Sequence, residues 1–347
     1  MINFSDSQLF SIVIHKVGNK SKEEVCKFSD SQIEPSIEIR SLLLHYFVTP
    51  FKSQEYNCFF HDVDLKFNEV YSYVSEIFRD PKNFLQQSIN LSKHLYEKSI
   101  HPKIQGGEFY ATYFKECKIN DEIVDAIGLF KSENKDTFLK VYQSGGKFEI
   151  QSDEGININK LDKGCIIFNM NKESGYIVLN VDNKNKGEEA KYWTNNFLHI
   201  QPRKDDFYYT QNILSLCKTF VTNELPKEFE VTKADQAILL NKSLNALKNG
   251  EQIELKKFAK DVFTQSNIID SFERYKSQYL EERNIQLEDT FNVSETAIKK
   301  KAKGLMATIK LDRNFEINIH GGDEYMERGY DKEKKLNFYR LFFVNEK

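Results

Sequence analysis

A run of six short segments with alternating apolar residues, from Gly106 to about Val181, limits most strongly what this chain can fold into. The connections between them contain Asn120–Asp121, Gly145–Gly146 and the stretch 171–175, which are rich in turn-forming residues. Connections this short favour antiparallel pairing, because parallel strands need crossovers of a dozen residues or more. We therefore expect an antiparallel meander sheet over about 106–200, with strands at 109–117, 123–130, 137–142, 148–151, 165–169 and 176–181.

The segment before this sheet, about residues 1–105, contains both strand and helix patterns. Apolar residues alternate from Phe10 to Ile14, as in a half-buried strand. Between 67 and 78 they recur at i, i+3, i+4 and i+7, which predicts one buried helix face. Further elements are expected as a helix between Pro35 and Pro50, a short strand at 56–61, and a second helix ending near Lys98.

Helical period returns at 205–221, and the stretch 223–231 with its Pro226 is the best candidate for a domain boundary. Thr232 and Asp235 then resemble a capping box that opens a helix. Helices are expected over 233–248, 255–263 and 268–282, and β structure at 315–319 and 336–343.

The predicted fold class is therefore α+β. The N-terminal domain, 1–222, would hold a mixed helix and strand part, about 1–105, and the antiparallel sheet, about 106–200. The C-terminal domain, 232–347, would be mainly helical and end in a β-hairpin.

Composition excludes several classes of protein. Of the 347 residues 40% are hydrophobic and 29% charged, which is a globular balance. No run reaches the roughly 18 apolar residues of a membrane span, and Met1 to Val17 lacks the pattern of a signal peptide. The 5 cysteines are scattered, which predicts reduced thiols in a cytoplasmic protein. Because the net charge is −3, nucleic-acid affinity would need a local basic patch.

The sequence contains no recognisable catalytic motif. Phosphate loops of the Walker type, the GxGxxG fingerprint, GxSxG and HExxH are all absent. His61-Asp-Val-Asp64 is the most tempting metal-binding group, but a strand-to-helix turn with an N-terminal carboxylate explains it well. A second acidic group is interleaved with basic residues and is typical of a solvated hairpin: Asp323, Glu324, Glu327, Asp331 and Glu333. We expect no metal, no cofactor and no enzyme activity, and keep a metal-dependent nuclease as a minor alternative.

The sharpest charge signal lies between Ser294 and Lys310, where 5 lysines accompany one glutamate. Ser294 is a plausible N-cap, and the apolar residues keep helical spacing as far as Ile309. One helix would then face the core with one side and present ammonium groups with the other. Such groups contact phosphates without reading bases. The candidate DNA-binding residues are Lys299, Lys300, Lys301, Lys303 and Lys310. The alternative is a solvated helix face.

The same C-terminal segments resemble the end of the bacterial nucleoid-associated proteins of NdpA type, and earlier pieces of the chain match in the same order. The pieces that carry the resemblance are Ile12–Val17, Gly106–Tyr110, Ala126–Asn134, Phe138–Val141, Tyr192–Phe197, Phe291–Lys303, Ile309–Gly321, Glu327–Lys334 and Asn337–Phe343. The resemblance covers nearly the whole chain.

This resemblance implies a non-enzymatic bacterial protein of the cytoplasm and nucleoid that binds DNA, expected as duplex, with little sequence preference. It supplies no binding motif, so the lysines above depend on charge and periodicity alone. The net charge of −3 departs from the strongly basic architectural proteins of bacteria. A second hypothesis is therefore a protein-interaction module that a nucleoid, replication or topology protein recruits. A homodimer is a candidate assembly, and no membrane association is expected.

Overall fold

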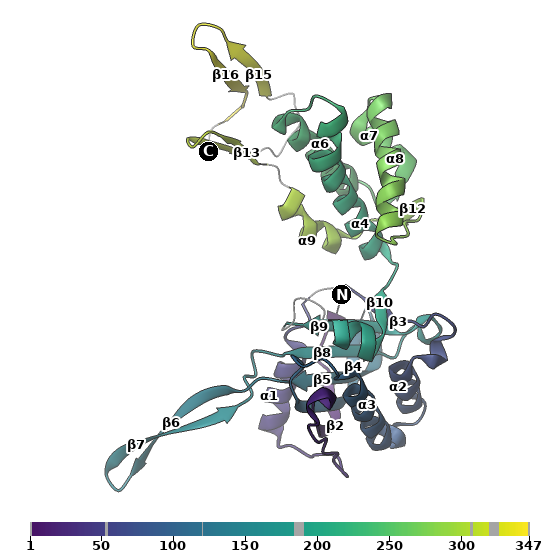
Figure 1. Ribbon diagram of the computed structural model, residues 1–347, viewed down its shortest axis with the longest axis vertical. Coiled ribbons are helices and arrows are strands. Elements are labelled where there is room, and N and C mark those ends of the chain that lie inside the picture. Colours follow the sequence, from purple (N-terminus) through teal and green to yellow (C-terminus); the bar gives the residue numbers. More distant parts are fainter. Residues whose placement is uncertain are drawn as a thin grey trace. The chain divides into compact units, whose positions relative to one another are not determined.

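The computed structural model describes residues 2–52, 55–119, 121–183, 191–305, 308–318 and 326–345. The chain forms two compact units, Met1–Arg203 and Lys204–Lys347 (Figure 1). The α+β fold class predicted from the sequence is confirmed.

The first unit is built on one antiparallel sheet. Its strands are β1 (Ile2–Asn3), β2 (Gln8–Val17), β3 (Asn57–Phe59), β4 (Gly107–Ile119), β5 (Glu122–Ser132), β8 (Lys163–Phe168), β9 (Ile177–Asp182) and β10 (Ile200–Pro202). The order is β1-β4-β5-β8-β9-β3-β10, and β2 also pairs with β4. The N-terminal strands thus join the same sheet as the strands after Gly106, which makes 1–105 and 106–200 one structure.

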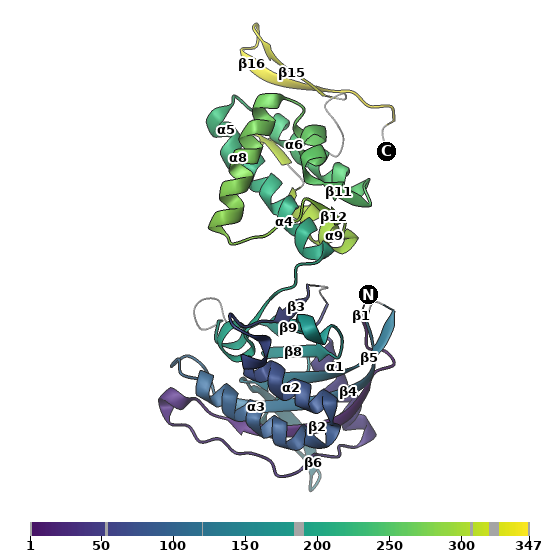
Figure 2. The same ribbon diagram turned by 90° about the vertical axis from the view of Figure 1, so that its right-hand side faces the viewer.

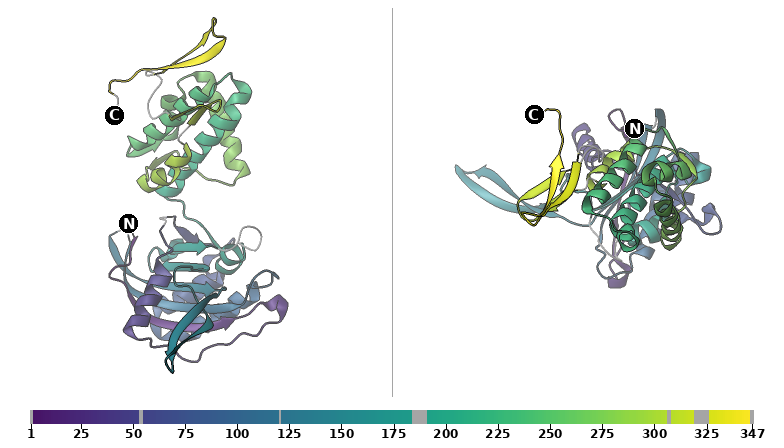
Figure 3. Two further views of the ribbon diagram at one scale, coloured as in Figure 1. Left: turned by 90° about the vertical axis from the view of Figure 1, so that its left-hand side faces the viewer. Right: turned by 90° about the horizontal axis from the view of Figure 1, so that it is seen from above.

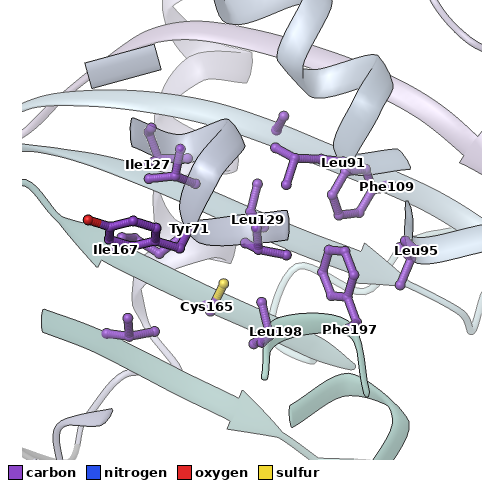
Figure 4. Close-up of a cluster of buried hydrophobic side chains, with 14 of the residues drawn as sticks. Tyr71, Leu91, Leu95, Phe109, Ile127, Leu129, Cys165, Ile167, Phe197 and Leu198 are labelled. Carbon is purple, nitrogen blue, oxygen red and sulfur yellow. The ribbon is translucent and has the colours of Figure 1, made fainter. Parts of the chain in front are cut away.

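Helices cover both faces of this sheet. α2 (Glu69–Arg79) and α3 (Phe84–Lys98) lie across one face (Figure 2), and α1 (Ile37–Val48) packs on the other. Because successive side chains of a strand point to opposite faces, Cys165 and Ile167 of β8 join the first core, whereas Ile166 and Phe168 join the second. Figure 4 shows the first core, where Leu91 and Phe197 approach the sheet residues from helical segments.

The expected continuous meander is wrong at one point. β5 pairs directly with β8, with Ala126 opposite Phe168 and Lys131 opposite Lys163. The two strands between them, β6 (Asp136–Ser144) and β7 (Lys147–Gly155), form a separate two-stranded ribbon. Alternation identified both strands correctly, but alternation does not state which strand they pair with.

The second unit is mainly helical. Its helices are α4 (Asp206–Thr219), α5 (Leu225–Glu228), α6 (Lys233–Lys248), α7 (Leu255–Phe263), α8 (Ser266–Glu282) and α9 (Glu295–Leu305). The Thr232–Asp235 capping box at the start of α6 is confirmed, with both reciprocal hydrogen bonds present. The strands pair as β11 (Gln252–Glu254) with β12 (Thr290–Asn292), β13 (Thr308–Leu311) with β14 (Phe315–Asn318), and β15 (Met326–Asp331) with β16 (Leu336–Leu341).

The division between the units falls between Arg203 and Lys204 rather than at 223–231. The reason is α4, which the sequence placed in a first domain ending at 222. Its buried residues, Ile213, Leu216 and Cys217 among them, pack into the core of the second unit with residues of α6, α7 and α8. An amphipathic pattern predicts that one helix face is buried, but it does not identify the partner.

Two lysines lie fully buried and directly opposite each other in the first unit, Lys131 on β5 and Lys163 on β8. Lys131 Nζ lies 3.0 Å from Glu133 Oε1, and Lys163 Nζ lies 2.7 Å from Asp182 Oδ1. The Tyr192 hydroxyl donates to Glu133 Oε1 at 2.7 Å, and its ring centroid lies 5.4 Å and 5.3 Å from the two ammonium nitrogens. Burial alone would raise the pKa of Glu133, but Lys131, Lys163 and Tyr192 together lower it.

None of the helices in the described ranges combines the length and hydropathy needed to cross a bilayer. All five cysteines are free thiols.

His15 on β2 is a buried, neutral histidine. The backbone N–H of Ser29 donates to Nδ1 at 3.1 Å, so the ring proton resides on Nε2, which lies 2.9 Å from Ser88 Oγ. Burial lowers the pKa of His15 to about 4 from its ordinary 6.5. The unfolded chain therefore takes up this proton near pH 6.5 and the folded chain only near pH 4. The contribution of neutral His15 to the free energy of unfolding is complete above pH 6.5 and is lost as the pH falls towards 4.

Between pH 7.5 and pH 5, His15 should lower the free energy of unfolding of the wild-type first unit by about 2 kcal/mol. We expect His15→Gln to abolish this part of the pH dependence. Urea unfolding followed by the fluorescence of the single, buried Trp193 measures this unit alone. The control is His45→Gln on an exposed face of α1. Equal pH dependence in the His15 variant and the wild type would contradict the assignment.

Candidate nucleic-acid interface

α9 carries most of the basic residues that the sequence singled out. It packs against α4 and α6 through Ala297, Ile298 and Leu305. Ser294 caps it as predicted: its hydroxyl accepts the N–H of Ala297 at 3.3 Å, and its own N–H donates to Thr210 Oγ1 at 3.0 Å. The second hydrogen bond ties the helix start to α4, so α9 is a fixed platform for its exposed side chains.

The candidate lysines on α9 differ in their surroundings. Lys299 is exposed, and its Nζ lies 3.2 Å from Glu295 Oε2 one turn earlier. Lys300 is exposed, and its Nζ lies 5.7 Å from the centroid of the Phe207 ring. Lys301 is half-buried, about 200° from Lys299 around a helix of 100° per residue. Lys303 lies on the helix, but its side chain is outside the described part.

Lys310 is not on this helix. α9 ends at Leu305, and Lys310 lies on β13, directly opposite Glu316 on β14. The spacing of Leu305 and Ile309 suited a longer helix, but Ile309 pairs with Ile317 in a hairpin. The opposing carboxylate makes Lys310 the weakest candidate of the set.

The structure adds one cation that sequence reasoning missed. A methyl group at Gly304 would lie 3.5 Å from Nζ of Lys218, so this ammonium of α4 sits beside the last turn of α9. The C-terminal end of a helix dipole favours a cation there. Lys218 is some 80 positions away in sequence, so only the packing of α4 on α9 reveals it. We call Lys218, Lys299 and Lys300 the α9 cation cluster.

A second basic group surrounds a pocket of about 540 Å³ in the first unit. Lys16 and Lys27 face each other in an antiparallel bridge, with reciprocal backbone hydrogen bonds of 2.8 Å and 2.9 Å. Lys22 also lines the pocket, and the Glu24 carboxylate within it accepts the N–H of Asn19 at 2.8 Å. With three lysines, this pocket group has as many cations as the α9 cation cluster.

The acidic groups have structural explanations. Asp64 caps a short helical turn by accepting the N–H of Lys66 at 2.9 Å, and this hydrogen bond, with Lys66, lowers the pKa of its carboxyl. Asp331 accepts two backbone N–H groups in the β15–β16 turn, and Glu327 pairs with Arg340 at 3.0 Å. Asp323 and Glu324 lie outside the described residues. Within the described ranges, His, Cys, Asp and Glu side chains form no group of three or more able to hold a metal ion.

The chain was compared with models of known protein families and with curated proteins. A family model described as "Nucleoid-associated protein YejK" matches residues 13–335, which is nearly the whole chain. A search of curated proteins found no match. The match includes both units, with α9 and the buried lysine pair.

Proposed function

The chain belongs to the nucleoid-associated protein family, and from that premise we propose that it binds duplex DNA directly, with little sequence preference. The contact would be made by the α9 cation cluster and would be electrostatic, to phosphates rather than to base edges. No catalytic step is part of this proposal. The observation that carries it is a capped and anchored helix, α9, that exposes Lys299 and Lys300, with the exposed Lys218 of α4 beside its last turn.

The chemistry of the cluster explains the proposed lack of specificity. Lysine ammonium groups act as point charges and do not form the planar, bidentate pairs that read a guanine edge. Each phosphate that they neutralise releases counterions, so affinity should fall steeply with salt. A chain with a net charge of −3 has no overall electrostatic attraction for DNA, so we expect weak binding that depends on this local cluster.

We expect the purified protein to bind two duplexes of unrelated sequence, at 50 mM salt, with affinities that agree within about threefold. Fluorescence anisotropy with two labelled duplexes of equal length measures this. Absence of binding at 50 mM salt, or a preference of a hundredfold for one sequence, would contradict the proposal.

The near-neutral charge also favours a second candidate function, an interaction module that a nucleoid, replication or topology protein recruits. A pull-down from bacterial lysate with and without nuclease separates the two. Partners lost after nuclease treatment would indicate recruitment through DNA. Partners that remain, together with no DNA binding by the purified protein, would favour the interaction module.

A further inference from the structure

The β6–β7 ribbon extends from the first unit between β5 and β8 (Figures 1 and 3). Its strands pair from Asp136 opposite Gly155 to Ser144 opposite Lys147. Gly145 and Gly146 join them with φ of +52° and +79°, as a two-residue type I′ turn requires. In the described part of the chain no other strand pairs with this ribbon. It is therefore a regular two-stranded hairpin that is separate from the sheet of the first unit.

The two faces of the ribbon differ in chemistry. One face carries its ion pair and polar contacts: Lys140 Nζ lies 2.9 Å from Asp153 Oδ2, and the Tyr142 hydroxyl donates to Glu149 at 3.1 Å. The other face is apolar and open to solvent. Its large residues keep most of their surface exposed: Leu139 68%, Val141 63%, Phe148 77% and Ile150 68%.

An uncovered face of this kind is physically unfavourable. An isolated two-stranded hairpin is marginal in water, and stable β structure needs a third strand or a covered apolar face. DNA does not suit the ribbon, because residues 136–155 contain two lysines against four carboxylates, a formal charge of −2. The apolar face of the ribbon is therefore suited to contact an apolar protein surface.

We propose that the occupant is the same ribbon of a second copy of this chain, packed face to face. Between Leu139 and Phe148 the apolar face carries no charge, and its one charged residue, Glu154, lies at the base opposite Thr137. Two identical faces can therefore meet without opposing like charges. Each copy offers four residues that expose roughly 500 Å² in total, so the pair buries about 1,000 Å², the lower bound of a specific interface.

The pairing is isologous, because each copy uses the same patch. Val141 and Ile150 lie opposite each other at its centre, and the two ribbons form a small sandwich of two layers. The inference does not rest on DNA contact, since it concerns the first unit alone. A dimer would carry two α9 cation clusters, which raises the avidity for a long duplex.

The test uses opposite charges at position 150 of the full-length chain. In sedimentation velocity without DNA, wild type should be dimeric at micromolar concentration. Ile150→Lys and Ile150→Glu should each be monomeric, with a dissociation constant at least a hundredfold higher. An equimolar mixture of the two variants should restore the dimer, because the opposed charges then attract. Circular dichroism should match wild type in both variants, since residue 150 is exposed.

The matched controls are Gln151→Lys and Gln151→Glu, which place the same charges on the opposite face of the same strand. Both should remain dimeric. Three results would overturn the proposal: a wild-type monomer at 100 μM, dimers of either position-150 variant as tight as wild type, or a mixture that stays monomeric. A wild-type monomer would mean that a different protein covers the ribbon.

Discussion

Replacing Lys131 by Met should destabilise the first unit by about 3–5 kcal/mol, because it leaves the Glu133 carboxylate buried without its nearest cation. The side chain of Glu133 is 1% exposed, and Lys131 Nζ is its partner at 3.0 Å. Lys131 also donates to the Gln105 carbonyl at 2.8 Å, and that bond would be lost as well. We expect the melting temperature of this unit to fall by about 10 °C. Trp193 fluorescence during heating measures this change.

The control is Lys135→Met, three residues after the end of β5. Lys135 Nζ lies 2.9 Å from Glu108 Oε1, but side chains of this pair are 46% and 26% exposed, and such pairs contribute at most about 1 kcal/mol. Adding Glu133→Gln to Lys131→Met should recover part of the loss, because no buried charge then remains unpaired. A loss below 1 kcal/mol in Lys131→Met would contradict the assigned role of the buried pair.

This penalty should depend on pH. In wild type the lowered pKa of Glu133 contributes stability above its ordinary pKa of 4.5, and that contribution is lost as the pH falls. In Lys131→Met the carboxyl is buried without Lys131, so its pKa rises and protonation relieves the penalty. The difference in unfolding free energy between Lys131→Met and wild type should therefore become smaller below about pH 5.

Local patterns in the sequence predicted the elements well. α6 and α7 have the predicted bounds, since a capping box and a helical apolar stripe mark them directly. The pairing of strands could not be predicted in the same way. β2 and β3 join strands from far along the chain, and alternation does not show which strand lies beside which. The β6–β7 ribbon is the clearest case, because its strands alternate as predicted but none of the described residues of the unit covers its apolar face.

The placement of the candidate lysines was predicted only in part. Lys299 and Lys300 are exposed on an anchored helix, as the charge pattern indicated. Lys310 was assigned to the wrong element, because a four-residue apolar spacing fits a helix and the start of a hairpin alike. Lys218 and the buried Lys131 gave no sequence signal, since a lysine in isolation is usually read as a surface residue.

Reversing the charge of the α9 cation cluster should have the largest effect on DNA affinity. The variant Lys218→Glu, Lys299→Glu, Lys300→Glu should bind duplex DNA about 100-fold more weakly at 0.1 M salt, because three phosphate contacts are replaced by repulsion. The charge-matched control is Lys16→Glu, Lys22→Glu, Lys27→Glu at the pocket of the first unit. The DNA affinity of this control should fall by less than about tenfold, since it changes the net charge equally without removing the proposed contacts. A larger loss in the control would place DNA on the first unit instead.

The central claim, direct phosphate contact by this cluster, is tested most directly by the slope of log affinity against log salt concentration. Lys218→Ala, Lys299→Ala, Lys300→Ala should make this slope less negative than that of wild type by about 2.7, or about 0.9 for each lost contact. Lys310→Ala should leave the slope unchanged, because Lys310 faces Glu316 on another element. Equal slopes for the triple variant and the wild type would contradict the account.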